Sequence, residues 1–212
     1  AWATYPSDGN ITNDTAYSTV IVAAGTTQTI PFNQNFETFP LCGTTSDCGV
    51  TTCAMLAGFI NESSTLIDNI DWRTDDQDTP SAGTGPAVDY NPGTATGNYL
   101  YLEASACYTQ TGQLLSPCID LTGATNPWLV FGYHMYGVNM GTLAVDVFAN
   151  NTWNNNLFTI SGNQGNVWNN AYVNLTAFAG QIVTIRWRGT TGANFASDMA
   201  IDAISISNST SS

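Results

Sequence analysis

The side chains with which this chain could do chemistry are mainly carboxylates. The 212 residues include 16 Asp and Glu but only three Arg and no Lys, which gives a formal net charge of −13. Several aspartates gather in the long irregular stretch 73–92, namely Asp75, Asp76, Asp78 and Asp89. Loops of this length in a compact domain are usually functional or ordered by a metal. Because carboxylates without cationic partners repel one another and Ca²⁺ prefers several oxygen ligands, the sequence predicts a calcium site, with a solvated acidic face as the alternative.

The sequence contains no catalytic motif. The single histidine, His134, lies inside an expected strand, where a catalytic role would need a nucleophile or a carboxylate beside it. No GxSxG, HExxH or Gly-rich phosphate-binding motif occurs. The glutamates are Glu37, Glu62 and Glu103, so the closely spaced glutamate pair typical of glycosidases is missing, although paired aspartates could still hydrolyse glycosides. We predict a protein that is not an enzyme, with a small glycosidase or lyase as the alternative.

The charge balance also limits the partners. A strongly acidic surface repels phosphate, which argues against nucleic acids and anionic membranes. No apolar run approaches the roughly 20 residues of a membrane-spanning helix, and no signal peptide is visible at Ala1. We therefore expect a processed, secreted piece that does not insert directly into a membrane.

Five cysteines indicate an oxidising compartment. Cys42, Cys48 and Cys53 crowd one Gly- and Thr-rich stretch, and Cys107 faces Cys118 across an expected turn. No CxxC pair occurs and there is one histidine, so the spacing fits no zinc site. We predict two disulfides and one leftover thiol. The more plausible bridge joins Cys107 to Cys118, and the pairing among the other three cysteines stays open.

The stretch 126–149 organises the expected fold. Residues 127–136 are apolar or aromatic on both alternating sets, which is typical of a central strand covered on both faces. Residues 142–148 alternate regularly, as in a half-buried strand. Between them Gly137, Asn139 and Gly141 accept positive φ, so the two strands are predicted to form an antiparallel hairpin.

Further strands are expected along most of the chain, and no helix longer than a turn or two. They cover residues 17–24, 30–37, 65–72, 98–104, 153–160, 168–175, 181–188 and 198–207, and residues 114–121 bring the chain back towards the central hairpin. Many short strands separated by turn residues predict an all-β fold, a two-sheet antiparallel β-sandwich of jelly-roll type. We expect a single domain over residues 17–208, a linker or lead-in over 1–16 and a flexible tail over 209–212.

These motifs resemble, in order, those of the MAM domain, an extracellular jelly-roll module. The resemblance covers roughly residues 32–208. It is carried by Phe36-Glu37, Trp72, GPAVDY at 85–90, GNYLYLEAS at 97–105, LLSP at 114–117, LVFGYHMYG at 129–137, GTLAVDV at 141–147, Trp153, Gly165-x-x-Trp168 and DMAID at 198–202. The chain departs from the family in lacking a cysteine before Phe36 and in having Asp202-Ala203 where a double aspartate is usual.

The resemblance also nominates a site. It implies that the segments around Phe36-Glu37, GPAVDY and DMAID converge at one edge of the sandwich, which makes Glu37, Asp89, Asp198 and Asp202 the calcium ligands. The next candidates are Asp71, Asp75 and Asp76. The same resemblance makes His134 a packed strand residue. Four aromatic residues would stack on sugars if exposed and belong to the core otherwise: Tyr99, Tyr101, Trp153 and Trp168.

The function implied by the resemblance is a non-catalytic extracellular adhesion or recognition module, stabilised by calcium, in a secreted or cell-surface multi-modular protein. Its partner would be a cell-surface protein or a glycan, and homophilic contacts between copies are a further option. An alternative within binding is a carbohydrate-binding module attached to a polysaccharide-degrading enzyme.

Overall fold

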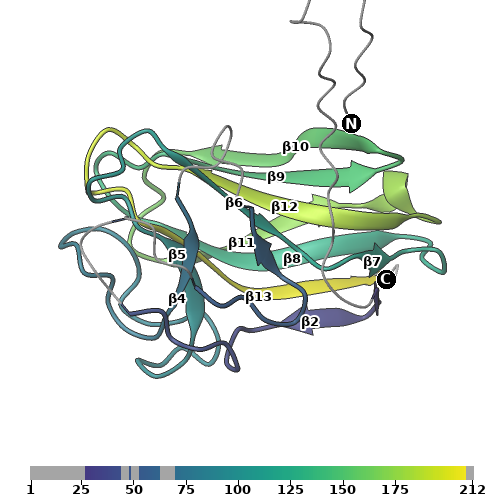
Figure 1. Ribbon diagram of the computed structural model, residues 1–212, viewed down its shortest axis with the longest axis horizontal. Coiled ribbons are helices and arrows are strands. Elements are labelled where there is room, and N and C mark those ends of the chain that lie inside the picture. The colour runs from purple at the N-terminus through teal and green to yellow at the C-terminus, as the bar shows by residue number, and fades with distance from the viewer. Residues whose placement is uncertain (1–26, 44–47, 49–52, 63–69, 209–212) are drawn as a thin grey trace, which may run out of the picture.

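The computed structural model describes residues 27–43, 48, 53–62 and 70–208, and it shows two β-sheets packed face to face (Figure 1). The seven-stranded sheet is centred on β12 (Ile182–Thr190). Along β12 lie β9 (Thr142–Ala149) on one side and β6 (Thr111–Leu115) with β7 (Ile119–Asp120) on the other. The outer strands are β10 (Thr152–Ser161) beside β9, β3 (Ile60–Asn61) beside β6 and β1 (Gln28–Thr29) beside β7.

The six-stranded sheet is centred on β13 (Met199–Asn208). One side of β13 pairs with β8 (Pro127–Met135), and the other side pairs with β5 (Tyr99–Leu102) and β2 (Phe32–Gln34). The flanking strands are β11 (Trp168–Asn174) beside β8 and β4 (Trp72–Asp75) beside β5. A single 3-10 turn, η1 (Thr176–Phe178), completes the regular structure of the described residues, none of which forms a helix long and apolar enough to cross a membrane.

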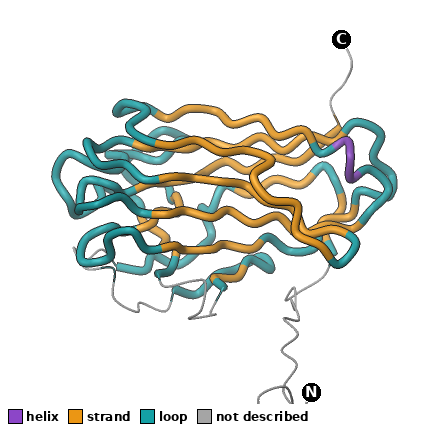
Figure 2. The backbone as a smooth tube through the Cα atoms, turned by 90° about the horizontal axis from the view of Figure 1, so that it is seen from above, coloured by secondary structure: helices purple, strands orange, loops and turns teal. Residues whose placement is uncertain are grey.

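The predicted all-β sandwich is confirmed, and the strands expected over 98–104, 153–160, 168–175, 181–188 and 198–207 are all present. Figure 2 shows the long strands running along the long axis, with loops gathered at both ends. The returning stretch 114–121 contains the end of β6 and all of β7, and the strand expected over 30–37 is limited to β2. The strand expected over 17–24, the lead-in, the tail and most of 65–72 lie outside the described residues.

The predicted hairpin over 126–149 is wrong, because its two strands belong to different sheets. β8 pairs with β11 and β13, whereas β9 pairs with β10 and β12. The glycines between them permit close approach to another loop instead of a tight turn. A Cβ on Gly141 would lie 1.8 Å from the carbonyl oxygen of Thr190, and one on Gly137 would lie 2.3 Å from that of Ala196.

The main core fills the space between the sheets. Trp187 on β12 lies near its centre and is fully buried. Its ring centroid lies 6.2 Å from that of Phe59 and 5.9 Å from that of Phe131, which comes from the opposite sheet. Such tilted and edge-to-face contacts add to the free energy gained from burying the rings.

A second, smaller layer covers the outer face of the six-stranded sheet. Tyr99, Tyr101 and Ala200 are fully buried there, and Trp168 packs against them. The segment 76–98 lies over them, since the indole Nε1 of Trp168 donates to the carbonyl oxygen of Val88 at 2.8 Å. This cover explains why β8 reads as apolar on both faces.

Two disulfides are present, as predicted, and Cys118 is the leftover thiol among the described residues. The bridges join Cys42 to Cys53 and Cys48 to Cys107, so the expected bridge between Cys107 and Cys118 is wrong. Strand β6 separates these two cysteines and, at about 3.4 Å per residue, holds them much further apart than the roughly 7 Å between Cα atoms that a disulfide tolerates.

Candidate functional site

Asp202 anchors the segment that covers the six-stranded sheet. Its Oδ2 accepts hydrogen bonds from the backbone N–H groups of Tyr90 at 3.0 Å and Asn91 at 3.2 Å, and its Oδ1 accepts one from Ala203 at 2.6 Å. Burial raises the pKa of Asp202 to about 7, against the effect of these hydrogen bonds, and the charge of Asp89 adds to the rise. The carboxylate is therefore a structural anchor that also lies beside a second acid.

Asp89 and Glu37 approach the same place from two other segments. Oδ1 of Asp89 accepts from the backbone N–H of Thr94 at 2.6 Å, while its buried Oδ2 has no hydrogen-bond partner. This oxygen lies directly over Gly97, where a Cβ would be 2.4 Å away. The next residue, Asn98, donates its backbone N–H to Oε1 of the exposed Glu37 at 3.1 Å. Three of the four nominated residues thus lie on, or bind, the segment 89–98 that leads into β5.

The fourth nominated residue, Asp198, lies elsewhere. It is four residues before Asp202 on nearly extended chain, a distance of roughly 13 Å at 3.3 Å per residue. Its neighbour is Glu103. Oδ1 of Asp198 accepts from the backbone N–H of Ala104 at 2.9 Å, and Oε1 of Glu103 accepts from that of Ser105 at 2.8 Å. The other oxygen of each carboxylate is buried without a partner. Burial raises the pKa of Asp198, and the charge of Glu103 raises it further.

The remaining candidate calcium ligands, Asp71, Asp75 and Asp76, do not form a metal-binding group with other described residues either. Asp75 is buried at the end of β4, its Oδ1 accepts the backbone N–H of Asp76 at 2.9 Å, and burial raises its pKa to about 6. Burial also raises the pKa of the half-buried Asp71, against the opposing charge of Arg73. Nowhere in the described chain do three or more His, Cys, Asp or Glu side chains form a group that could hold a metal ion. A cation bound here would therefore need backbone carbonyl oxygens among its ligands.

His134 is a packed strand residue, as expected. It is 2% exposed, and its Nε2 lies 3.1 Å from Oδ1 of Asn166. Burial lowers the pKa of His134 to about 4, so the ring is neutral at pH 7. The four aromatic residues considered for sugar stacking differ in exposure. Tyr99 and Tyr101 belong to the covered layer, whereas Trp153 and Trp168 are half-buried.

A cluster that the sequence analysis missed lies on the outer face of the seven-stranded sheet. Asp146 on β9 is fully buried and accepts from Nε of Arg186 at 2.8 Å and from Nε of Arg188 at 3.0 Å. The guanidinium of Arg186 lies 3.9 Å from the ring centroid of Trp153. The sequence places these opposite charges at outward positions of two predicted strands, but it does not show that the two strands pair.

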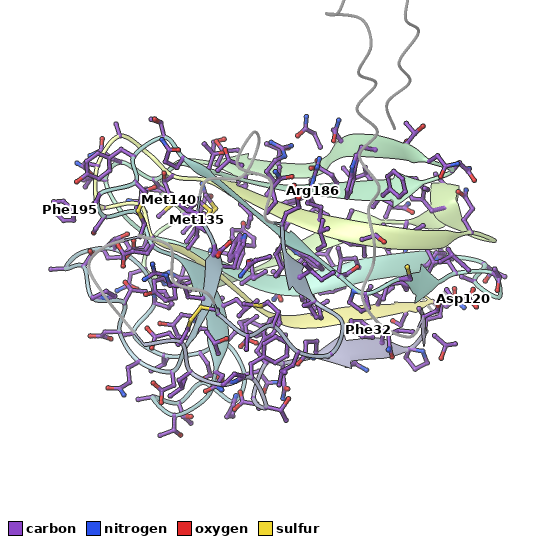
Figure 3. All side chains as sticks on the ribbon, viewed as in Figure 1. Phe32, Asp120, Met135, Met140, Arg186 and Phe195 are labelled. Atoms are coloured by element: carbon purple, nitrogen blue, oxygen red, sulfur yellow. A yellow bond between two sulfur atoms is a disulfide. The ribbon has the colours of Figure 1, made fainter. Side chains whose placement is uncertain are left out.

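Three loops at one end of the sandwich expose apolar side chains. Tyr108 is 43% exposed, Val138 83% and Phe195 47%. Figure 3 shows Phe195 at the outermost point of this end, with Asp120 at the opposite end. Backbone hydrogen bonds join the loops: Thr109 donates to Gly192 at 3.0 Å and Asn139 donates to Ala196 at 3.3 Å. We call Tyr108, Val138 and Phe195 the apolar loop end.

Comparison with known proteins gives a family match over most of the chain. The family described as "MAM domain, meprin/A5/mu" matches residues 35–211. The rat MAM domain-containing glycosylphosphatidylinositol anchor protein 1 is 31% identical over 180 residues, which are 81% of this chain and 16% of that protein. Neuropilin-1 of Xenopus laevis is 34% identical over 128 residues, 59% of this chain and 13% of that protein. The chain spans about 16% of the length of the first curated relatives it matches.

A solved structure has the same fold at low sequence identity. The K1 cleaved adhesin domain of Lys-gingipain from Porphyromonas gingivalis W83 superposes with a TM-score of 0.54 at 15% identity, covering 84% of this chain and 98% of that one. At this identity the likeness concerns the fold alone.

Proposed function

The chain belongs to the MAM domain family, and from this we propose that it is a non-catalytic adhesion or recognition module within a longer secreted or cell-surface protein. The relatives support this proposal, since one is named for a glycosylphosphatidylinositol anchor and another is neuropilin-1. The two disulfides agree with the predicted extracellular location.

The observation that carries the proposal is the apolar loop end. Segments 106–110, 137–141 and 191–197 contain no charged residue, in a chain of net charge −13. Protein interfaces are depleted in charge at their centre and enriched in aromatic side chains. The hydrogen bonds between the loops hold the surface in place, so that binding would order few groups. We propose that this end contacts a cell-surface protein.

The test is binding of the soluble domain to cells and to itself. A triple variant, Tyr108→Ser with Val138→Ser and Phe195→Ser, should lose at least tenfold in affinity for a cell-surface protein while melting at an unchanged temperature. Tyr172→Ser, on the 64% exposed Tyr172 of β11, is the matched control and should bind normally. If the triple variant binds as tightly as the native domain, this surface is not the contact. Self-association lost in the triple variant would identify a homophilic contact instead.

Calcium remains part of the proposal. Since no three acidic side chains of the described residues form a metal-binding group, the ion would be bound by the buried Oδ2 of Asp89 together with backbone carbonyl oxygens. The ion would supply positive charge where acids gather without basic partners. Asp198 lies roughly 13 Å from Asp202 along the extended chain, so Asp198 and its neighbour Glu103 are too distant to bind the same ion.

A further inference from the structure

All positive side-chain charge that reaches the surface is concentrated in one place. The sequence has three Arg and no Lys, and Arg73 is 1% exposed. The side chains of Arg186 and Arg188 are 11% and 28% exposed and lie two residues apart on the outer face of β12. With Asp146 between them the cluster carries a net charge of +1. An anionic ligand of this acidic protein therefore has a single favourable surface on which to bind.

The two guanidinium groups keep donors for such a ligand. Asp146 accepts from Nε of Arg186 and from Nε and Nη2 of Arg188, and Nη2 of Arg186 forms an ion pair with its Oδ2 at 2.7 Å. The Nη2 groups also donate to Oδ1 of Asn155 at 3.0 Å and Oδ1 of Asn156 at 2.9 Å. Among the described residues, Nη1 of each arginine has no hydrogen-bond partner, and it is not among the buried unpaired atoms. Each Nη1 carries two N–H donors, so four remain for an oxyanion.

The arginines are also held in position before any ligand arrives. Arg186 is fixed between Asp146 and the indole of Trp153, and Arg188 is held by both oxygens of Asp146. An arginine normally loses up to roughly 2 kcal/mol of side-chain entropy when it is immobilised. Here the fold has already ordered both side chains, which favours binding.

Neutral donors flank the arginines. Asn155 and Asn156 are exposed and lie in a bulge of β10, where Asn156 has a φ of 61° and its backbone N–H donates to Oδ1 of Asp146 at 2.8 Å. Their side-chain Oδ1 atoms accept from the arginines, and their Nδ2 groups have no hydrogen-bond partner in the part of the chain that the structure describes. Amide donors beside a forked cation suit a ligand that carries one carboxylate among several hydroxyl groups.

We propose that Arg186 and Arg188, with the amides of Asn155 and Asn156, bind a carboxylate-bearing sugar residue of an acidic glycan. The planar carboxylate matches the fork of a guanidinium group, and its single charge neutralises the net +1 of the cluster. An acidic peptide fits less well, because its side chains offer carboxylates but few hydroxyl groups to the amides of Asn155 and Asn156. The site lies on the sheet face, away from the end marked by Phe195 (Figure 3), so it is independent of the proposed protein contact.

The test is calorimetric titration with a trisaccharide that carries one galacturonic acid residue and with the methyl ester of that residue, which has the same hydroxyl groups but no charge. The native domain should bind the acid at least tenfold more tightly than the ester, and added sodium chloride should weaken the binding. Arg188→Gln should lose at least tenfold in affinity. Because Arg188 also pairs with the buried Asp146, the variant is titrated at a temperature well below its thermal unfolding, which separates lost binding from lost folding.

Tyr172→Glu is the matched control, because it makes the same change of −1 in net charge on the other sheet and should leave binding unchanged. Equal affinity for acid and ester, native affinity in folded Arg188→Gln, or an equal loss in Tyr172→Glu would overturn the proposal. So would tighter binding of a sulfated trisaccharide or of a glutamate-rich peptide. None of these results bears on the apolar loop end.

Discussion

Asp146 shows how far a single residue can depart from its sequence pattern. It occupies the outward position of the alternating stretch 142–148, where the sequence predicts an exposed carboxylate. The structure corrects this, since Asp146 is fully buried between two arginines. Burial alone would raise its pKa, but hydrogen bonds from Arg188, the backbone of Asn156 and Arg186 hold the pKa below its usual value. Asp146 is therefore charged across the ordinary pH range.

Replacing Asp146 should destabilise the fold strongly. Asp146→Ala leaves two partly buried guanidinium groups without their shared carboxylate and removes the acceptor for the N–H of Asn156. We expect a loss of about 3 kcal/mol in the free energy of unfolding, the lower end of the range for breaking a buried ion pair, because Arg188 is partly exposed. Urea denaturation measures this. Asp78→Ala, at an exposed aspartate, is the control, and a similar small effect in both would contradict the buried role of Asp146.

At the scale of elements, the alternation of the sequence was enough to predict the long strands. Residues such as Ile185 and Trp187 face the core, and Arg186 and Arg188 face outward, as the period of two requires. Alternation identifies the buried face of a strand but not its neighbour in the sheet. The hairpin over 126–149 was therefore predicted wrongly, although both of its strands exist.

The candidate site was predictable only in part. The family motifs located Glu37, Asp89 and Asp202, of which Asp89 and Asp202 lie close enough for their charges to interact, while Glu37 binds the backbone at Asn98. The motifs did not show that Asp198 lies apart from Asp202, since positions close together in a motif can be far apart along an extended strand. The arginine cluster requires the pairing of β9 with β12, which no local pattern encodes.

The disulfides should contribute unequally. The bridge between Cys48 and Cys107 spans 59 residues and that between Cys42 and Cys53 spans 11, so the entropy lost by the unfolded chain corresponds to about 4 and about 3 kcal/mol. Cys107→Ser should therefore lower the urea midpoint more than Cys53→Ser does. Cys118→Ser should be nearly neutral, because the thiol has only a weak contact of 3.9 Å with Oγ1 of Thr184. Thiol titration of the denatured, unreduced protein should find about one thiol, and a different count would contradict this pairing.

For the whole molecule, the acids covered by the segment 76–98 make stability depend on pH. Burial raises the pKa of Asp75 to about 6 and that of Asp202 to about 7. A raised pKa in the folded state means that the folded protein binds more protons, so its extra stability is present below about pH 4 and is lost as the pH rises to 7. Below pH 4, protonation of Asp146 opposes this gain.

The expected result is a maximum of stability in mildly acidic solution when no divalent cation is present. The thermal midpoint of chelator-treated protein should fall between pH 5 and pH 8, and a loss of roughly 3 kcal/mol would lower it by about 6 to 12 °C for a domain of this size. Asp75→Asn should flatten the lower part of this curve, because the amide does not ionise. A thermal midpoint that rises steadily to pH 8 would show that ionising these acids costs the folded protein no stability.

Calcium should reverse this loss, and more strongly at high pH. A ligand that binds only the folded chain stabilises it by about 2.7 kcal/mol at a hundred times its Kd, and it must displace protons from the carboxylates it binds. The gain in thermal midpoint should therefore be larger at pH 8 than at pH 5, larger for calcium than for magnesium, and only partly reproduced by sodium chloride. Asp89→Asn should remove the part of the gain in thermal midpoint that is specific to calcium, because it neutralises the carboxylate whose buried Oδ2 has no partner in the described chain. Asp78→Asn, at an exposed aspartate of the same segment, should retain this calcium-specific gain. If calcium and sodium chloride at equal ionic strength gave equal midpoints in the native protein, the acids would be stabilised by screening alone and no ion would be bound among them.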